Sequence, residues 1–430
     1  MHRDDAIKNF LGIHQEELSA SVSKLTLLAL GFLILTGCVV NEVRPQPKLQ
    51  AVQATQMIAQ AELLDVAVVD FDSGVPKALL DDEQELEKRR IYPEVRRAES
   101  RLLAVRLKET LENTGQWGAV RVVPPSVNYV DVVVTGRIIE STGSELALRV
   151  SARDASGRVW IDDKPYQADA DLGSYKTEAA LKARDPFQNI YVQIADDLLA
   201  ARQQLSATQR REVRQIAELR FAGDLDPASF SGYIQASEGG QWSLVRLPAA
   251  DDPALLRIRA IRERDASVID TLDGYNQEFS DQLFESYGSF RRTSREAIEK
   301  ADKARNQAMT RTVLGAAAVL GSIFVGSNCS SMDYNCRRID DAVRTAGVIG
   351  GTAAVMSGIK KFSDAKIAAQ EVRELADSFE AEVAGQVVEV EGRTLKLTGT
   401  AEEQYREWRR LLAAIYREET LPESAATPAP

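Results

Sequence analysis

The stretch Asp65-Val-Ala-Val-Val-Asp-Phe71 decides the first part of the fold, because it is a valine-rich apolar run that ends at the turn-prone residues 72–74. Runs of this length and composition, bounded by turn residues, are typical of buried β-strands. Residues 81–113 follow as a charged segment whose second half places leucine and valine at helical spacing. Pro93 is expected to interrupt this segment, since proline lacks the amide hydrogen that an inner helical turn requires. The sequence therefore predicts a strand followed by a helix.

Four further strands and a closing helix complete this predicted unit. The strands are expected at 119–123, 130–140, 146–153 and 158–161, and the helix at 187–205. Residues 154–157, Asp-Ala-Ser-Gly, form a turn signal, so the last two strands are expected to make a hairpin. We therefore expect a small mixed-sheet αβ domain over residues 62–206.

Four patterns in this domain carry a resemblance to a known group of proteins. They are Val66-Ala-Val-Val-Asp-Phe71, Leu111-Glu-Asn-Thr-Gly115, Asp131-Val-Val-Val-Thr-Gly136, and Val150-Ser-Ala-Arg-Asp154 followed by Gly157. The order of elements and these patterns resemble the small αβ domain of periplasmic assembly lipoproteins: the curli-secretion lipoprotein CsgG, the penicillin-binding-protein activator LpoB, PelC, and the N-terminal domain of TolB. The resemblance covers about a third of the chain. It implies partner binding or oligomerisation, and it brings no catalytic residues to this sequence.

Residues 207–421 are predicted to form a second, mainly helical domain, which makes the fold class α+β. Residues 254–311 have helical periodicity, and we expect breaks near Asp273-Gly274 and at Gly288. A short β-hairpin is predicted at 387–398, and a last helix at 401–419. Residues 422–430 are predicted to be a disordered tail.

The N-terminal residues 1–37 are predicted to be a signal peptide. Leu25–Leu35 is an apolar run of 11 residues that follows Lys24, and it is too short to span a hydrocarbon core of roughly 30 Å. The run ends in Leu35-Thr-Gly-Cys38, which resembles the bacterial lipobox. The resemblance implies that Cys38 carries a diacylglycerol and an N-acyl lipid such as palmitate. A buried core helix that happens to end in cysteine is the alternative interpretation.

The residues around Cys38 bear on where the leader begins and where the protein is sorted. Asp4, Asp5, Glu16 and Glu17 are unusual in a leader, and they favour a misassigned start with translation beginning near Val22. Position 39 is valine instead of the aspartate that would suggest retention at the inner membrane, so the resemblance implies the periplasmic face of the outer membrane. Residues 38–61 are polar and contain two prolines, and we expect a lipid-anchored tether.

The composition of the chain excludes several classes of function. Both histidines, His2 and His14, precede Cys38, so the processed chain has no Ser-His-Asp or Cys-His catalysis and no histidine-based zinc site. The formal net charge of −11 argues against nucleic acid as a partner, because phosphate backbones bind basic surfaces. We therefore expect no catalytic residues, no metal and no cofactor apart from the covalent lipid.

An uncharged segment at 312–359 is predicted to form a helical hairpin. Two stripes of small residues would let the helices approach closely, as in glycine-zipper packing; they are Gly315, Ala318, Ser322 and Gly326 on one helix and Gly347, Gly351, Ala354 and Gly358 on the other. Cys329 and Cys336 lie between the two helices, and a disulfide between them would suit the oxidising periplasm. The hairpin is either a buried core or subunit interface, or an element that enters the membrane.

These observations predict a non-catalytic lipoprotein that acts as a periplasmic scaffold or assembly factor of the cell envelope. Its expected partners are the membrane, through the lipid anchor, and envelope proteins or further copies of the chain. One alternative is a subunit of an oligomeric pore or secretion complex whose hairpin enters the membrane. A second alternative is a carboxylate-based cell-wall hydrolase, because two carboxylates can hydrolyse a glycosidic bond without histidine.

Overall fold

The computed structural model describes residues 47–325, 386–390, 393–397 and 400–420, together with isolated helical positions at 367, 370 and 374. The side chains of Glu87, of residues 301–302 and 304–325, and of residues 386–397 are not described. The chain divides into two units, Met1–Gln46 and Pro47–Pro430.

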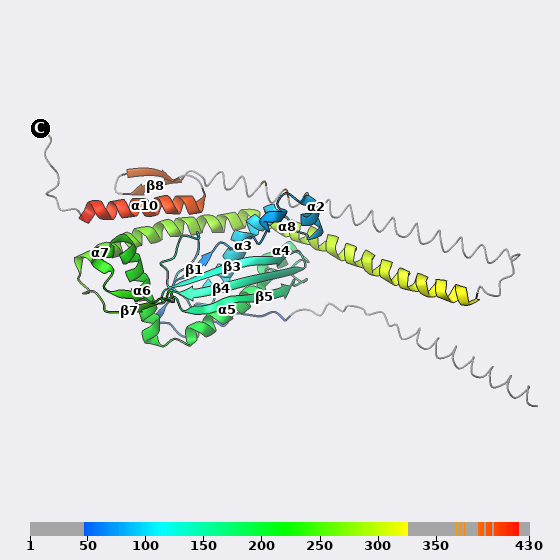
Figure 1. The fold of residues 1–430 in the computed structure, drawn as a ribbon, viewed down its shortest axis with the longest axis horizontal. Helices are drawn as coiled ribbons and strands as arrows, with labels where there is room; N and C mark the ends of the chain where they lie inside the picture. Colours follow the sequence, from blue (N-terminus) through cyan, green and yellow to red (C-terminus); the bar gives the residue numbers. More distant parts are fainter. Residues whose placement is uncertain are drawn as a thin grey trace, which may run out of the picture. The chain divides into compact units, whose positions relative to one another are not determined.

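A mixed five-stranded sheet forms the centre of the second unit (Figure 1). Its strands are β1 (Val66–Val69), β2 (Val120–Val123), β3 (Val132–Ser141), β4 (Glu145–Asp154) and β5 (Val159–Asp169), in the order β2-β1-β3-β4-β5. Strand β1 pairs in parallel with β2 and β3, whereas β3, β4 and β5 form an antiparallel meander. All four residues of β1 are buried, as expected for a central parallel strand covered on both faces. The predicted α+β class and the predicted strands are confirmed.

The predicted αβ domain of residues 62–206 also contains helices. They are α2 (Glu83–Lys88), α3 (Pro93–Glu112), α4 (Glu178–Ala183) and α5 (Gln188–Gln203). Pro93 is the first residue of α3, where its missing amide hydrogen costs nothing because no helical acceptor precedes it. Helix α3 contacts β1, β2, β3 and α5, and α5 contacts β5. Short 3-10 turns occur at Gln60–Glu62 and Lys77–Leu79.

Helix α8 runs without a break from Pro253 to Val325, so the prediction of breaks at Asp273-Gly274 and at Gly288 was wrong. Gly274 is exposed, and a Cβ atom placed on it would meet no atom within 4 Å. A Cβ atom on Gly288 would lie 2.7 Å from Leu181 Cδ2 of α4. Gly288 therefore lets Leu181 of α4 approach α8 closely, and a larger residue there would require the Leu181 side chain to move. The helix tolerates Gly274 at a cost of about 1 kcal/mol relative to alanine.

The remaining described elements are smaller. They are α6 (Ala207–Leu225), α7 (Pro227–Phe230), β6 (Ile234–Ala236), β7 (Trp242–Leu244), β8 (Gln386–Val390), β9 (Arg393–Leu397) and α10 (Ala401–Thr420). Strands β8 and β9 pair antiparallel, so the predicted hairpin at 387–398 and the predicted last helix at 401–419 are confirmed. Helix α6 begins with a capping box made by Ser206 and Gln209.

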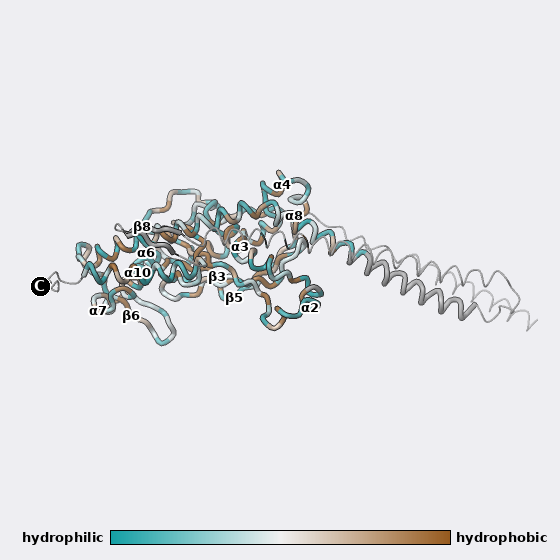
Figure 2. The backbone as a smooth tube through the Cα atoms, turned by 90° about the horizontal axis from the view of Figure 1, so that it is seen from above, coloured by the Kyte–Doolittle hydropathy of each residue, from teal (hydrophilic) through white to brown (hydrophobic). Residues whose placement is uncertain are grey.

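One buried apolar cluster joins the segments on the two sides of residue 206. It contains Val66 and Val68 of β1, Ile258 and Ile261 of α8, and Trp408 of α10, among others. Helix α8 contacts α3 and β2, and α10 lies along the first half of α8 (Figure 1). The apolar segments gather where strands and helices meet (Figure 2). The αβ unit and the first part of α8 therefore share a single core.

Candidate functional site

Most of the residues singled out from the sequence lie outside the described part of the chain. These are Cys38, Cys329, Cys336, Gly326, Gly347, Gly351, Ala354 and Gly358. Gly315, Ala318 and Ser322 of the first stripe lie on α8. The predicted helical conformation is therefore confirmed at these three positions. The lipid, the disulfide and the hairpin stay predictions. Among the described residues, no helix is both long and apolar enough to cross a membrane, and no group of three acidic, cysteine or histidine residues could hold a metal.

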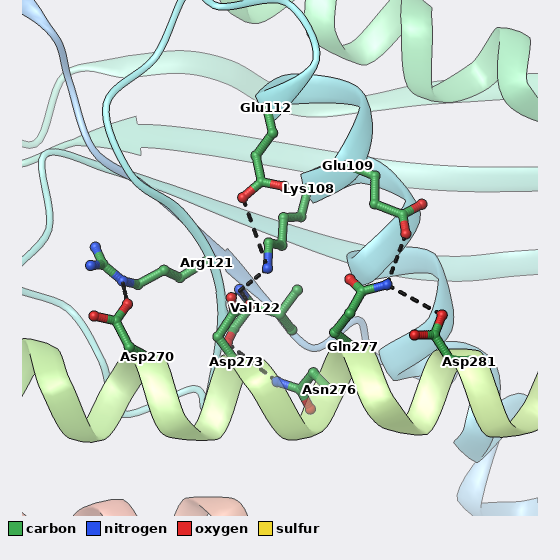
Figure 3. Close-up of polar contacts among 10 residues, drawn as sticks. All are labelled: Lys108, Glu109, Glu112, Arg121, Val122, Asp270, Asp273, Asn276, Gln277 and Asp281. Atoms are coloured by element: carbon green, nitrogen blue, oxygen red, sulfur yellow. Dashed lines mark hydrogen bonds and ion pairs between the residues drawn. The ribbon is translucent and has the colours of Figure 1, made fainter.

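The side chains that hold α8 on the sheet form a polar seam along strand β2 (Figure 3). Asp273 Oδ1 accepts a hydrogen bond from the Val122 amide at 2.7 Å, and Asn276 Nδ2 donates to the Val122 carbonyl at 3.3 Å. Asp273 also pairs with Lys108 of α3. Strand β2 lies at one edge of the sheet, and edge strands expose backbone groups that promote unwanted pairing. The seam satisfies those groups with side chains of α8.

Further pairs extend the seam on both sides of Asp273. Arg121 of β2 pairs with Asp270. Gln277 Nε2 donates to Glu109 Oε1 of α3 at 3.1 Å. All of these α8 residues fall within about two turns, so the seam fixes a short section of α8 against both α3 and β2.

A buried carboxylate, Glu99 of α3, forms a second attachment of α8. It is 1% exposed, and its Oε1 accepts hydrogen bonds from Tyr287 Oη and Ser141 Oγ, each at 2.6 Å. Burial raises the pKa of Tyr287 well above its usual value, and the charges of nearby Glu99 raise it further. The phenol therefore stays protonated and keeps donating to the carboxylate.

A cavity of about 240 Å³ opens beside this attachment, between α3, α8 and residues 181–188. Four cationic side chains and two carboxylates line it: Arg106, Lys182, Arg184 and Arg291, with Glu109 and Asp185. The lining therefore has a formal charge of +2 in a chain whose net charge is −11. We define this space as the cationic cavity.

Arg291 is the buried member of the cationic cavity. Its side chain is 3% exposed, and its Nη1 lies 3.0 Å from Asp185 Oδ2. The guanidinium carbon lies 4.9 Å from the centre of the Phe187 ring and 4.2 Å from that of Tyr287. Burial would lower the pKa of Arg291, but the nearby Asp185 carboxylate helps to raise it well above the ordinary value. Its Nε and Nη2 groups have no hydrogen-bond partner, and neither does the fully buried Ser280 Oγ.

The segment that leads into the body from the N-terminus is fixed next to the cationic cavity. Asn189 Nδ2 donates to the Pro47 carbonyl at 2.9 Å, and Asn189 Oδ1 accepts from the Leu49 amide at 3.1 Å. Arg184, a cavity residue, donates to the Leu49 carbonyl at 3.1 Å. The Val52 amide donates to Asp196 Oδ1. The predicted tether is therefore attached to the body from Pro47 onward.

A carboxylate pair, Asp65 and Asp131, lies at the start of the parallel strands. Asp131 is 1% exposed, and its side chain accepts a hydrogen bond from the Asp65 amide at 2.9 Å. Burial raises the pKa of Asp131 to about 6, and the charge of Asp65 adds to the shift. Arg214 Nε lies 3.8 Å from Asp131 Oδ2, and Asp65 Oδ1 accepts from the Ala119 amide at 2.8 Å. Both carboxylates thus organise the ends of strands.

The comparisons with known proteins give no family for this chain. No family model matches it, and neither the curated proteins nor the solved structures contain a match. The resemblance to periplasmic assembly lipoproteins therefore stays a prediction. Sequence reasoning missed the seam and the cationic cavity, because their members come from segments up to 185 residues apart, such as Arg106 and Arg291, and no local pattern brings them together.

Proposed function

We propose that this chain is a non-catalytic, lipid-anchored scaffold of the bacterial cell envelope. The lipobox-like sequence ending at Cys38 supports the anchor. The observation that carries the scaffold role is the attachment of α8: it is a single helix of 73 residues, held on the sheet by the seam and by Glu99. At about 1.5 Å per residue such a helix is roughly 110 Å long.

The length of α8 supports binding of other proteins. The helix continues to Val325, and a helix of this length offers a long face on which a partner helix can pack. Polar groups of the seam are engaged with backbone groups and with one another, which suits a structural role.

The anchor is tested by cell fractionation of the wild type, a Cys38→Ala variant and a Cys329→Ala control that keeps Cys38. The wild type and the control are expected in the outer-membrane fraction. The Cys38→Ala variant, given a soluble periplasmic signal, is expected in the soluble periplasm. Wild-type protein that remains in the cytoplasm would contradict export, and equal membrane association of all three would contradict the lipid anchor.

Self-association is tested by analytical ultracentrifugation of the same soluble Cys38→Ala chain over a range of concentrations. A concentration-dependent dimer or larger species supports a scaffold built from copies of this chain. A monomer throughout contradicts self-association and directs the search to partner proteins of the envelope.

One observation favours a second candidate, a subunit of a pore or secretion complex. Helix α8 includes Thr312–Val325, which is the uncharged first part of the predicted hairpin. If the hairpin enters the bilayer, the Cys38→Ala chain should stay with membranes after a carbonate wash, and its oligomer should depend on detergent. Release by the wash would exclude this candidate.

A further inference from the structure

We infer that the cationic cavity binds a phosphate group. Its lining carries four cationic and two anionic side chains, and one of the cations, Lys182, pairs with Glu178. One positive charge therefore remains without a carboxylate partner, which suits an anionic phosphate group. The volume of about 240 Å³ is below the roughly 300–1,000 Å³ of pockets for drug-sized ligands. The cavity therefore suits a small group such as a phosphate with a few attached atoms.

The charges of the lining are only partly neutralised within the protein. Arg106 pairs with Glu109 at 2.7 Å, and Lys182 pairs with Glu178 at 2.6 Å. Arg184 instead donates to neutral oxygens, those of Leu49 and Asn189. An arginine whose described partners are neutral retains its full charge for an incoming anion.

Arg291 adds a buried positive charge to the lining of the cavity. Its ion pair with Asp185 engages Nη1, and its Nε and Nη2 groups are shielded from solvent. Because these groups do not reach the open space, the charge of Arg291 acts on an anion in the cavity at a distance, through surroundings of low dielectric constant.

The position of the cavity suggests where the phosphate could come from, and this step rests on the proposed lipid anchor. Residues 39–46 separate Cys38 from Pro47, and the nine steps along the chain span at most about 30 Å when fully extended. Pro47 and Leu49 are bonded to Asn189, and Leu49 is bonded to Arg184 at the cavity rim. An anchored body would therefore hold the cavity close to lipid headgroups. The phosphate is either that of a headgroup or that of a soluble compound.

Two charge-reversal variants test the cavity with a matched control. Lys182→Glu changes a cavity cation with a 61% exposed side chain and an i−4 partner, Glu178. Arg406→Glu changes a cation on α10 with a 60% exposed side chain and an i−4 partner, Glu402. The two substitutions carry the same change in charge at similarly exposed cations, but only Lys182 lines the cavity. Arg184→Gln is a third variant, and it keeps a side-chain donor for the Leu49 carbonyl.

The first measurement is thermal unfolding of the soluble Cys38→Ala chain with inorganic phosphate or with sodium chloride at equal ionic strength. Phosphate is expected to raise the midpoint more than chloride, and Lys182→Glu and Arg184→Gln should weaken phosphate binding by about tenfold. Arg406→Glu should bind like its parent. An equal response to phosphate and chloride would mean that the cavity holds only water, and it would overturn the inference.

The second measurement is co-sedimentation of the same chains with vesicles of phosphatidylglycerol or of phosphatidylcholine. Binding to the first vesicles that is lost in Lys182→Glu and kept in Arg406→Glu identifies a lipid headgroup. Phosphate binding without vesicle binding identifies a soluble compound. Equal loss of vesicle binding in both variants, without a specific phosphate effect, would show general surface attraction and would overturn the inference. Neither measurement requires Cys38 to be lipidated, so failure of the anchor and failure of this site are distinguishable.

Discussion

The Asp273 carboxylate of α8 accepts a hydrogen bond from the backbone amide of Val122, an edge-strand residue 151 positions away in the chain. A side chain thus occupies the place that the carbonyl of a neighbouring strand would take. Asn276 completes the substitution by donating to the Val122 carbonyl. The arrangement ends the sheet at β2 without a further strand and ties the helix to the sheet at one defined position.

Removal of the Asp273 carboxylate should therefore destabilise the protein more than removal of its neighbour Asp270. Asp273→Ala leaves the Val122 amide without its acceptor, and it leaves the buried Lys108 ammonium with the Glu112 carboxylate at 3.9 Å. We expect a loss of about 3 kcal/mol in the free energy of unfolding. Asp270 has a 57% exposed side chain, so Asp270→Ala should cost about 0.5 kcal/mol. Urea denaturation measures both values, and equal effects would show that the seam does not hold α8.

Gly274 and Gly288 of α8 should respond in opposite ways to substitution by alanine. Gly274→Ala meets open space and should stabilise the protein by about 0.5–1 kcal/mol through helix propensity. Gly288→Ala places a methyl group against Leu181 and should cost about 1–3 kcal/mol, as overpacking does.

A double-mutant cycle identifies the cause of the second effect. Leu181→Ala removes the atom that the new methyl group would meet, so Gly288→Ala should cost less in that background than in the wild type. The same cost in both backgrounds would place the strain elsewhere. The midpoint of thermal unfolding is a sufficient measure for all four chains.

Some features of the fold are determined by residues that are adjacent in the chain. Strand β1, the start of α3 at Pro93 and the β8–β9 hairpin depend on apolar runs and turn residues that are adjacent in the chain, and each could be predicted. Continuity of α8 could not, because Gly288 reads as a break until Leu181 of α4 is known to pack against it. The seam could not be predicted from the sequence either. Val122 gives no sign in the sequence that its strand lies at an edge, and Asp273 reads as a solvated helix residue.

Two buried tyrosines allow the contribution of a hydrogen bond to stability to be distinguished from the contribution of burial. Tyr287 donates to Glu99 at 2.6 Å, whereas the hydroxyl of fully buried Tyr191 makes no hydrogen bond of normal geometry and lies near the Arg291 guanidinium. Tyr287→Phe should therefore cost about 1–3 kcal/mol, because it removes a donor from a buried carboxylate. Tyr191→Phe should be nearly neutral. Chemical denaturation of the two variants tests this difference, and a larger loss for Tyr191→Phe would contradict the assigned roles.

The buried Asp131 should give the protein a distinct dependence of stability on pH. Its pKa is raised from 3.8 to about 6 by burial and by Asp65, so between these values the folded state holds a proton that the unfolded state has lost. Stability should therefore fall as the pH rises from about 4 to about 6, and the loss should be complete above the folded pKa. The shift corresponds to about 3 kcal/mol as an upper bound.

The Asp131→Asn variant isolates this contribution from those of other carboxylates. An amide oxygen can still accept the hydrogen bond from the Asp65 amide, but it carries no charge and does not titrate. We expect the variant to match the wild type near pH 4 and to exceed its stability at pH 7, with the difference developing between these two values. The measurement is the free energy of unfolding in urea at several pH values. A constant difference between the two chains would show that Asp131 ionises normally in the folded protein.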